Sequence, residues 1–412
     1  MYRCSIVFTV KELMFIVISI LLFFQIYLQK NIVFFQYLDE IVTVFCLYQI
    51  FVAAIRGKLK KSGFHILLLI GFIILIGLLS NILGKVQTGI IPILTDIGNC
   101  FKVFIVFVGS DIFLSKVNNK ERIIKSLAGL IRIFVLILFI CMIGHEIGVF
   151  NMGNDVRYGL RSFKFINDVA GQLTLMFYSI ILILTADLQY GSQKRKKIFI
   201  ILALIVWAST LRSRAFMYII IYIFLYRKMI IKGEKFKFNI KNGILILFVL
   251  LIFGMNQFET YFSNEATARS NLMRYGIYTL LRFFPLGSGF ATFGTDAAYT
   301  YYSSLYVEYG FDRVFGLSQE NGMFSHDTYW AAIFAQFGVI GTILVAFLIL
   351  LVCREILKRT RYSNVTYLAG LFICITQVSS SIATATFFHF VTVGTFFLVP
   401  LLFQKEQGIY ET

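Results

Sequence analysis

Long apolar segments recur along the whole chain, and short polar connections separate them. A helix needs roughly 20 apolar residues to cross about 30 Å of hydrocarbon, and most of the segments reach or approach that length. The seventh, eighth, ninth and last two are shorter. The pattern predicts twelve membrane-spanning helices, over Met14–Leu28, Ile41–Ile55, Ile66–Leu83, Ile90–Leu114, Leu127–Ile143, Val169–Leu188, Ile198–Ala208, Ala215–Tyr226, Ile244–Met255, Tyr329–Val352, Val365–Val378 and Phe390–Phe403.

Clusters of lysine and arginine occupy every second connection, beginning with the one that follows the second predicted span. Examples are Arg56 with Lys58, and the run from Lys194 to Lys197. Basic connections of membrane proteins face the cytoplasm, so both chain ends are predicted to be cytoplasmic. The sequence therefore predicts an all-α polytopic membrane protein with about twelve spans, forming one integral membrane domain over residues 1–412.

Composition agrees with this class of protein. Of the 412 residues, 58% are hydrophobic and 14% are charged, whereas soluble domains have about 25% charged residues. The net charge of +17 follows from the basic cytoplasmic connections, so no nucleic-acid partner is predicted. The six cysteines have no ligand spacing, so neither a metal site nor a disulfide is expected.

The predicted outer connections have a different basic composition. They contain eight arginines and only three lysines. Topology requires positive charge alone, whereas the planar guanidinium fork suits binding of oxyanions, particularly phosphate. The alternative is that these arginines are solvated or pair with acidic neighbours such as Asp155, Asp168 and Glu265.

One large extracytoplasmic loop is predicted from about Asn256 to Asp327. It is rich in tyrosine and phenylalanine, whose rings either stack on sugars or anchor the loop at the membrane interface. Charges within the predicted spans are few, and they include Asp96, Lys102 and Arg132. Such residues usually face the protein interior and often mark function.

Two segments resemble a known family. Leu211-Arg212-Ser213-Arg214-Ala215-Phe216 is similar to the Ser-Arg turn of the O-antigen ligase and polysaccharide polymerase superfamily. The second segment begins at Thr267-Ala268-Arg269, continues through Phe284–Phe290, and ends with His326–Trp330 followed by Gln336–Gly341. This order of motifs resembles bacterial surface-polysaccharide polymerases of the O-antigen and capsule type.

The resemblance implies a metal-independent, inverting glycosyltransferase of the membrane-embedded C-type fold, with no cofactor. Its substrate would be an undecaprenyl-pyrophosphate-linked oligosaccharide, which serves as both donor and acceptor. The enzyme would act on the outer face of the cytoplasmic membrane of a bacterium, within the lipid bilayer. A chain-length regulator and a flippase are the protein partners that the resemblance implies.

The resemblance also implies roles for individual residues. Arg214 and Arg269 match the family's functional arginines, which would stabilise the leaving pyrophosphate. The catalytic base is left open between two neighbours. Asp327 lies eleven residues before Gly338, where the ligase branch has its histidine, and His326 is one residue early but has an imidazole suited to proton transfer near neutral pH. Asp327 is alternatively the N-cap of the tenth span.

Four further arginines are candidates for substrate binding, namely Arg161, Arg212, Arg274 and Arg282. Three rival functions remain open. A ligase would transfer the finished glycan to a lipid A-core acceptor. A flippase or other transporter would carry the lipid-linked oligosaccharide across the membrane. A scaffold of a polysaccharide assembly complex would have no activity of its own.

Overall fold

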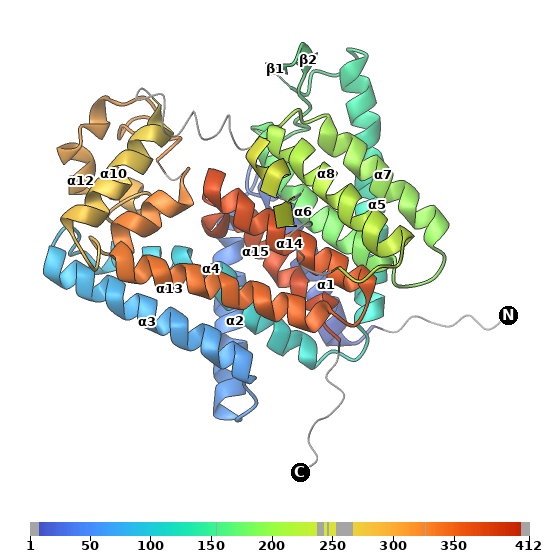
Figure 1. The fold of residues 1–412 in the computed structure, drawn as a ribbon, viewed down its shortest axis with the longest axis horizontal. Helices are drawn as coiled ribbons and strands as arrows, with labels where there is room; N and C mark the ends of the chain where they lie inside the picture. The colour runs from blue at the N-terminus through green and yellow to red at the C-terminus, as the bar shows by residue number, and fades with distance from the viewer. Residues whose placement is uncertain are drawn as a thin grey trace.

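The computed structural model describes residues 8–153, 155–236, 243–244, 247–252, 267–325 and 327–404. Within these residues helices are the main secondary structure, and eight of them are long and apolar enough to cross a membrane (Figure 1). They are α1 (Val10–Leu28), α2 (Leu38–Ile55, with the preceding η1, Val33–Tyr37), α3 (Lys61–Gly84), α4 (Ile90–Ser115), α5 (Lys120–Glu146), α6 (Ala170–Asp187), α13 (Tyr329–Thr360) and α14 (Asn364–Ala383). The predicted all-α, membrane-embedded class is confirmed.

The other four predicted spans have less support. Two coincide with α7 (Gln193–Ala208) and α8 (Ser213–Tyr226), which have 16 and 14 residues. The last coincides with α15 (Phe390–Leu398) and the following η5 (Val399–Leu402). All three are shorter than the roughly 20 residues of a typical span. The ninth, Ile244–Met255, is described only at residues 244 and 247–252, so the total of twelve stays a prediction.

The helices form two groups joined by a central set (Figure 1). On one side, α10 (Ala268–Arg282) packs against α13, and α13 packs against α3. On the other side, α5, α6 and α7 pack together, with α8 next to α7. The centre contains α1, α2, α4, α14 and α15. The α2–α3 connection lies at the lower edge of this view, and the hairpin of β1 (Val156–Arg157) and β2 (Leu160–Arg161) lies at the upper edge.

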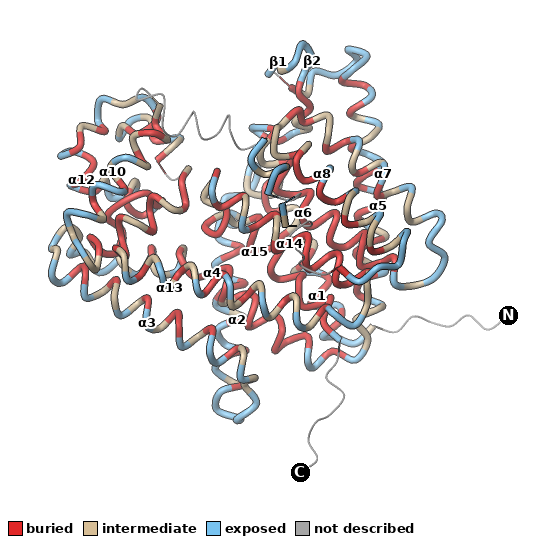
Figure 2. The backbone as a smooth tube through the Cα atoms, in the orientation of Figure 1, coloured by how far each residue is buried: buried red, intermediate tan, exposed pale blue. Residues whose placement is uncertain are grey.

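Burial distinguishes central from peripheral helices (Figure 2). Every residue of α6 from Leu173 to Asp187 is buried. In contrast, α3 exposes Phe64, Leu68, Phe72, Leu75 and Leu79 at helical spacing. An apolar stripe of this kind is stable only against lipid or another apolar surface, so α3 presents one face to the bilayer.

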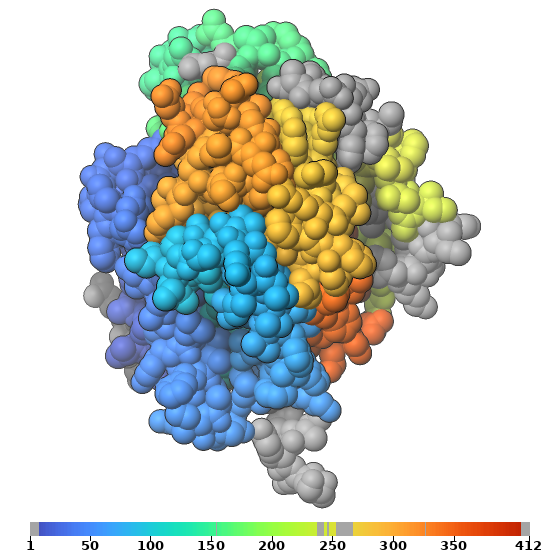
Figure 3. Space-filling view, turned by 90° about the vertical axis from the view of Figure 1, so that its left-hand side faces the viewer, coloured from blue at the N-terminus to red at the C-terminus, as the bar shows by residue number. Residues whose placement is uncertain are grey.

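The described residues between 267 and 328, part of which faces the viewer in Figure 3, fold around a small core that also includes Ala331 and Ala335 of α13. The short helices of this segment are α10, α11 (Asp296–Thr300), α12 (Ser304–Glu308) and η3 (Phe311–Arg313). Phe293, Tyr306 and Phe311 are buried in this core, and the rings of Tyr275 and Tyr309 stack at 4.7 Å. The buried rings of Phe293, Tyr306 and Phe311 stabilise the segment and are therefore not available to stack on a sugar.

A break in α13 ties this segment to the membrane helices. Gly338 has φ 59° and ψ −158° inside the helix. The backbone N–H groups of Ser288 and Gly289 donate hydrogen bonds to Ala335 O and Gln336 O, at 2.8 and 2.9 Å. The backbone turns at Pro285–Gly289, where Gly287 and Gly289 both have positive φ, a conformation that glycine adopts without strain.

Two polar side chains of the membrane helices α3 and α4 accept hydrogen bonds from the backbone just after this turn. Asp96 Oδ2 accepts a hydrogen bond from Ala291 N at 2.6 Å, and Asn81 Oδ1 accepts one from Phe290 N at 2.8 Å. Asp96 is fully buried, as expected for a charge within a span. Its contact gives it a structural role, since it satisfies an N–H group that would otherwise be buried without a partner.

The contact between Gly287 and the break in α13 leads to a stability prediction. A Cβ atom on Gly287 would overlap the backbone nitrogen of Gly338, and its φ of +89° is strained for an L side chain. Gly287→Ala is expected to lower the free energy of unfolding by roughly 1–3 kcal/mol from backbone strain alone, measured as a lower thermal midpoint in detergent. Gly71→Ala is the control, because nothing lies near its Cβ position. Equal midpoints for the two variants would contradict the packing described.

Candidate active site

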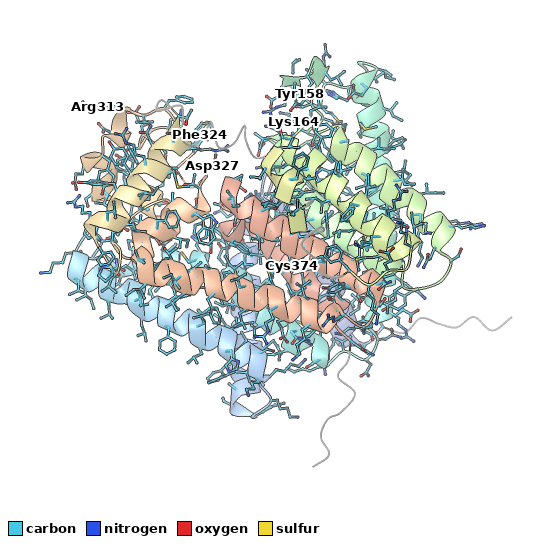
Figure 4. All side chains as sticks on the ribbon, in the orientation of Figure 1. Tyr158, Lys164, Arg313, Phe324, Asp327 and Cys374 are labelled. Atoms are coloured by element: carbon cyan, nitrogen blue, oxygen red, sulfur yellow. The ribbon has the colours of Figure 1, made fainter. Side chains whose placement is uncertain are left out.

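A polar cavity of about 710 Å³ lies between the two groups of helices. This volume falls within the range of small-molecule sites. In Figure 4, Phe324 and Asp327 lie on one side of the gap, and Tyr158 and Lys164 lie on the other. The titratable side chains that line the cavity are Asp39, Glu40, Lys102, Arg212, Arg214, Arg269, Asp296, Asp327 and His389.

The first wall contains the N-terminus of α8. Arg212 is its N-cap and Arg214 its second residue, and no side chain caps the first turn by a hydrogen bond. The first N–H groups of a helix lack intrahelical partners and favour a nearby anion. Two guanidinium groups therefore lie where the helix itself contributes positive potential.

A network of hydroxyl groups positions Arg214. Its Nη1 donates to Thr384 Oγ1 at 3.1 Å, and Thr384 donates to Ser380 O at 3.1 Å. The hydroxyl of Ser380 is hydrogen-bonded to Tyr178 at 2.7 Å and to Tyr218 at 2.8 Å. Among the residues that the structure describes, no carboxylate lies within 4 Å of the Arg214 guanidinium. Arg214 is thus a fixed cation without an anionic partner in that part of the chain.

Arg212 is engaged by the hairpin. Its Nη2 donates to Asp155 Oδ2 at 2.8 Å. Burial lowers the pKa of Arg212, as do the neighbouring positive charges of Arg157, Arg214 and Arg269, whereas Asp155 opposes them. The contributions of Arg157, Arg214 and Arg269 to this lowered pKa reflect the positive charges that lie near Arg212.

The opposite wall contains the start of α10 and the residues before α13. Arg269 donates from both Nε and Nη2 to Asp327 Oδ2, and the Nε–Oδ2 distance is 2.8 Å. The predicted cation and one of the two predicted bases therefore form an ion pair. The N-cap of α13 is Thr328, and Asp327 directs its carboxylate to Arg269 instead. His326 lies outside the described residues, so the choice between His326 and Asp327 stays open.

Three predicted substrate-binding arginines do not line the cavity. Arg161 is exposed on β2, and Arg274 is exposed on α10. Arg282 pairs with Glu308, and its guanidinium lies 5.2 Å from the centre of the Phe283 ring. The structure thus brings together Arg212, Arg214, Arg269 and Asp327, and leaves these three outside.

The floor of the cavity contains an ion pair from α2 and α4. Lys102 Nζ lies 2.6 Å from Asp39 Oδ2 and 3.9 Å from Glu40 Oε1. Gln25 Nε2 donates to Asp39 Oδ1 at 2.9 Å. The sequence drew attention to Lys102 as a charge within a span, but not to Asp39 or Glu40, which stand at the start of an apolar run.

His389 is another cavity residue that the sequence did not single out. It is the N-cap of α15, and its Nδ1 accepts a hydrogen bond from Val391 N at 3.2 Å. The sequence does contain a signal for His389, because it follows Thr384 and Thr386 in the short connection between the last two predicted spans. Within the described ranges, no three His, Cys, Asp or Glu side chains are grouped to hold a metal ion.

Comparisons with known proteins found no matching family model and no matching curated protein sequence. The fold and the site together define a membrane-embedded, all-α protein with a polar cavity that has an arginine-rich wall.

The ion pair at the floor leads to a second stability prediction. Removing one member of a buried pair typically costs about 3–5 kcal/mol, because the remaining charge is uncompensated. Lys102→Met is therefore expected to lower the thermal midpoint strongly, and adding Asp39→Asn should restore most of the loss. Lys125→Met is the control, because Lys125 pairs with Glu121 at an exposed position, where such pairs contribute about 1 kcal/mol or less. A similar small effect in both single variants would contradict a buried pair.

Proposed function

We propose that this protein is a surface-polysaccharide polymerase, which joins oligosaccharide repeat units carried on undecaprenyl pyrophosphate at the outer face of a bacterial cytoplasmic membrane. One observation carries the proposal. The two segments that resemble such polymerases are far apart in the chain, yet Arg212 and Arg214 from one and Arg269 from the other line a single cavity. Convergent cations in a polar cavity suit a substrate with a pyrophosphate group.

Arg214 is the proposed binding residue for the donor pyrophosphate. Its guanidinium is fixed by Thr384, and it lies at the start of α8. A cation that is already in place when negative charge develops on a leaving group lowers the barrier without reorganisation. Arg212 adds positive potential, although Asp155 holds part of its donor capacity.

The proposed reaction is a single displacement. A hydroxyl of the acceptor attacks the anomeric carbon on the face opposite the pyrophosphate, and the configuration is inverted. Lipid pyrophosphate leaves with the bonding electrons toward Arg214. If Asp327 took the proton, Arg269 would have to exchange its two hydrogen bonds to that carboxylate for bonds to the substrate.

One observation bears on the transporter alternative. Transporters often bind substrates at discontinuous helices near the membrane midplane, and α13 is interrupted at Gly338. However, the carbonyl groups of Ala335 and Gln336 at this break accept hydrogen bonds from Ser288 and Gly289. Because these two carbonyls already bind the Ser288–Gly289 turn, the break serves the packing of that turn against α13, and the enzyme is favoured.

The polymerase is tested by reconstituting purified protein in nanodiscs with its lipid-linked repeat unit and separating the products on a gel. Wild type should give a ladder of glycan lengths. Arg214→Ala should reduce the initial rate at least about a hundredfold, as expected for removal of one transition-state contact. Arg214→Lys should also be impaired, because an ammonium group cannot reproduce the bidentate fork.

Arg313→Ala is the matched control, because the Arg313 side chain is 87% exposed and lies at the outer edge of the molecule in Figure 4. It should polymerise like wild type. No ladder from folded wild type with authentic substrate would contradict the polymerase and lead to a trial of the ligase with a core-lipid acceptor. Transport of the repeat unit across vesicles without joining would support the flippase.

A further inference from the structure

Within the part of the chain that the structure describes, some of the charged groups that line the cavity form ion pairs, and others do not. Asp327 receives two hydrogen bonds from Arg269, and Asp39 receives one each from Lys102 and Gln25. Arg214, in contrast, has no carboxylate within 4 Å among the described residues. The paired groups largely neutralise each other, so substrate chemistry has to be sought at the groups outside these pairs.

Glu40 is a carboxylate of the cavity that has no cation of the described residues within hydrogen-bond distance and shares a hydrogen bond with the adjacent Asp39 carboxylate. Its nearest cation is Lys102, at 3.9 Å, which exceeds hydrogen-bond distance. The Glu40 side chain is 48% exposed, whereas the adjacent Asp39 side chain is 2% exposed. Glu40 therefore presents carboxylate oxygens to the cavity while its neighbour neutralises the lysine.

The other groups of the floor suit hydroxyl ligands. Gln36 and Asn99 also line this part of the cavity. Asn99 Oδ1 accepts from Lys102 at 3.4 Å, which leaves its amide N–H groups as donors. Amides and carboxylates together accept from and donate to sugar hydroxyls. The arginine wall suits an anion, and the floor suits the uncharged hydroxyl groups of a glycan.

We infer that the floor of the cavity binds the acceptor sugar and that Glu40 is the catalytic base, in place of His326 or Asp327. The inference rests on the proposed polymerase function and names the acceptor end of its site. The acceptor O–H bond breaks, and its proton passes to the Glu40 carboxylate. The acceptor oxygen bonds to the anomeric carbon as the bond from that carbon to pyrophosphate oxygen breaks, and the electron pair leaves with the lipid pyrophosphate.

Azide distinguishes a base from a merely structural residue, because the azide anion attacks carbon without giving up a proton. Glu40→Ala should reduce polymerisation at least about a hundredfold, within the range that general bases contribute. Sodium azide should then restore consumption of the donor, with glycosyl azide and undecaprenyl pyrophosphate as products detected by mass spectrometry. Arg214→Ala should yield no glycosyl azide, because the leaving group would still lack its cation.

Glu121→Gln is the control, since Glu121 pairs with Lys125 on the exposed surface and should polymerise like wild type. Polymerisation by Glu40→Gln at the wild-type rate would overturn this inference alone. So would azide rescue of Asp327→Asn or His326→Ala instead of Glu40→Ala, or a folded Glu40→Ala variant that azide does not rescue. Absence of product from wild type would overturn the polymerase itself, and this inference with it.

Discussion

The geometry of the cavity depends on the hydrogen bonds that the backbone carbonyl groups accept at the break in α13. A helix interrupted inside the membrane exposes carbonyl groups that find no water there. At Gly338 these groups accept hydrogen bonds from Ser288 and Gly289, and only glycine fits at Gly287, where the two backbones meet. This contact fixes the segment that precedes α11 against α3, α4 and α13. It thereby places Asp296, and through α10 also Arg269, opposite the arginines of α8.

Within the cavity, charged side chains that form ion pairs have structural roles, and those without such a partner have the proposed chemical roles. Lys102 with Asp39 and Arg269 with Asp327 connect elements that are distant in sequence. The Lys102–Asp39 pair is buried, so breaking it is costly. Arg214 is held by the hydroxyl of Thr384 rather than by a carboxylate. A cation positioned in this way keeps its charge available to a substrate.

The eight long spans could be predicted from the sequence because each depends only on its own apolar length. Arg214 and Arg269 could be proposed from local motifs. The pairing of Arg269 with Asp327, 58 residues away, could not, because it depends on tertiary packing. Glu40 was missed since a polar residue before an apolar run is ordinary at a membrane interface. The role of Tyr306 was equally ambiguous, because the same ring serves a protein core or a sugar platform.

The central claim is that lipid pyrophosphate is the leaving group of a glycosyl transfer. The most direct measurement is to quantify undecaprenyl pyrophosphate and new glycosidic bonds together, by mass spectrometry, as purified wild-type protein consumes its lipid-linked repeat unit. The account predicts that the two products appear in equal amounts, and that both rates fall in parallel in Arg214→Ala. Movement of the intact repeat unit across the bilayer with no pyrophosphate released would contradict it.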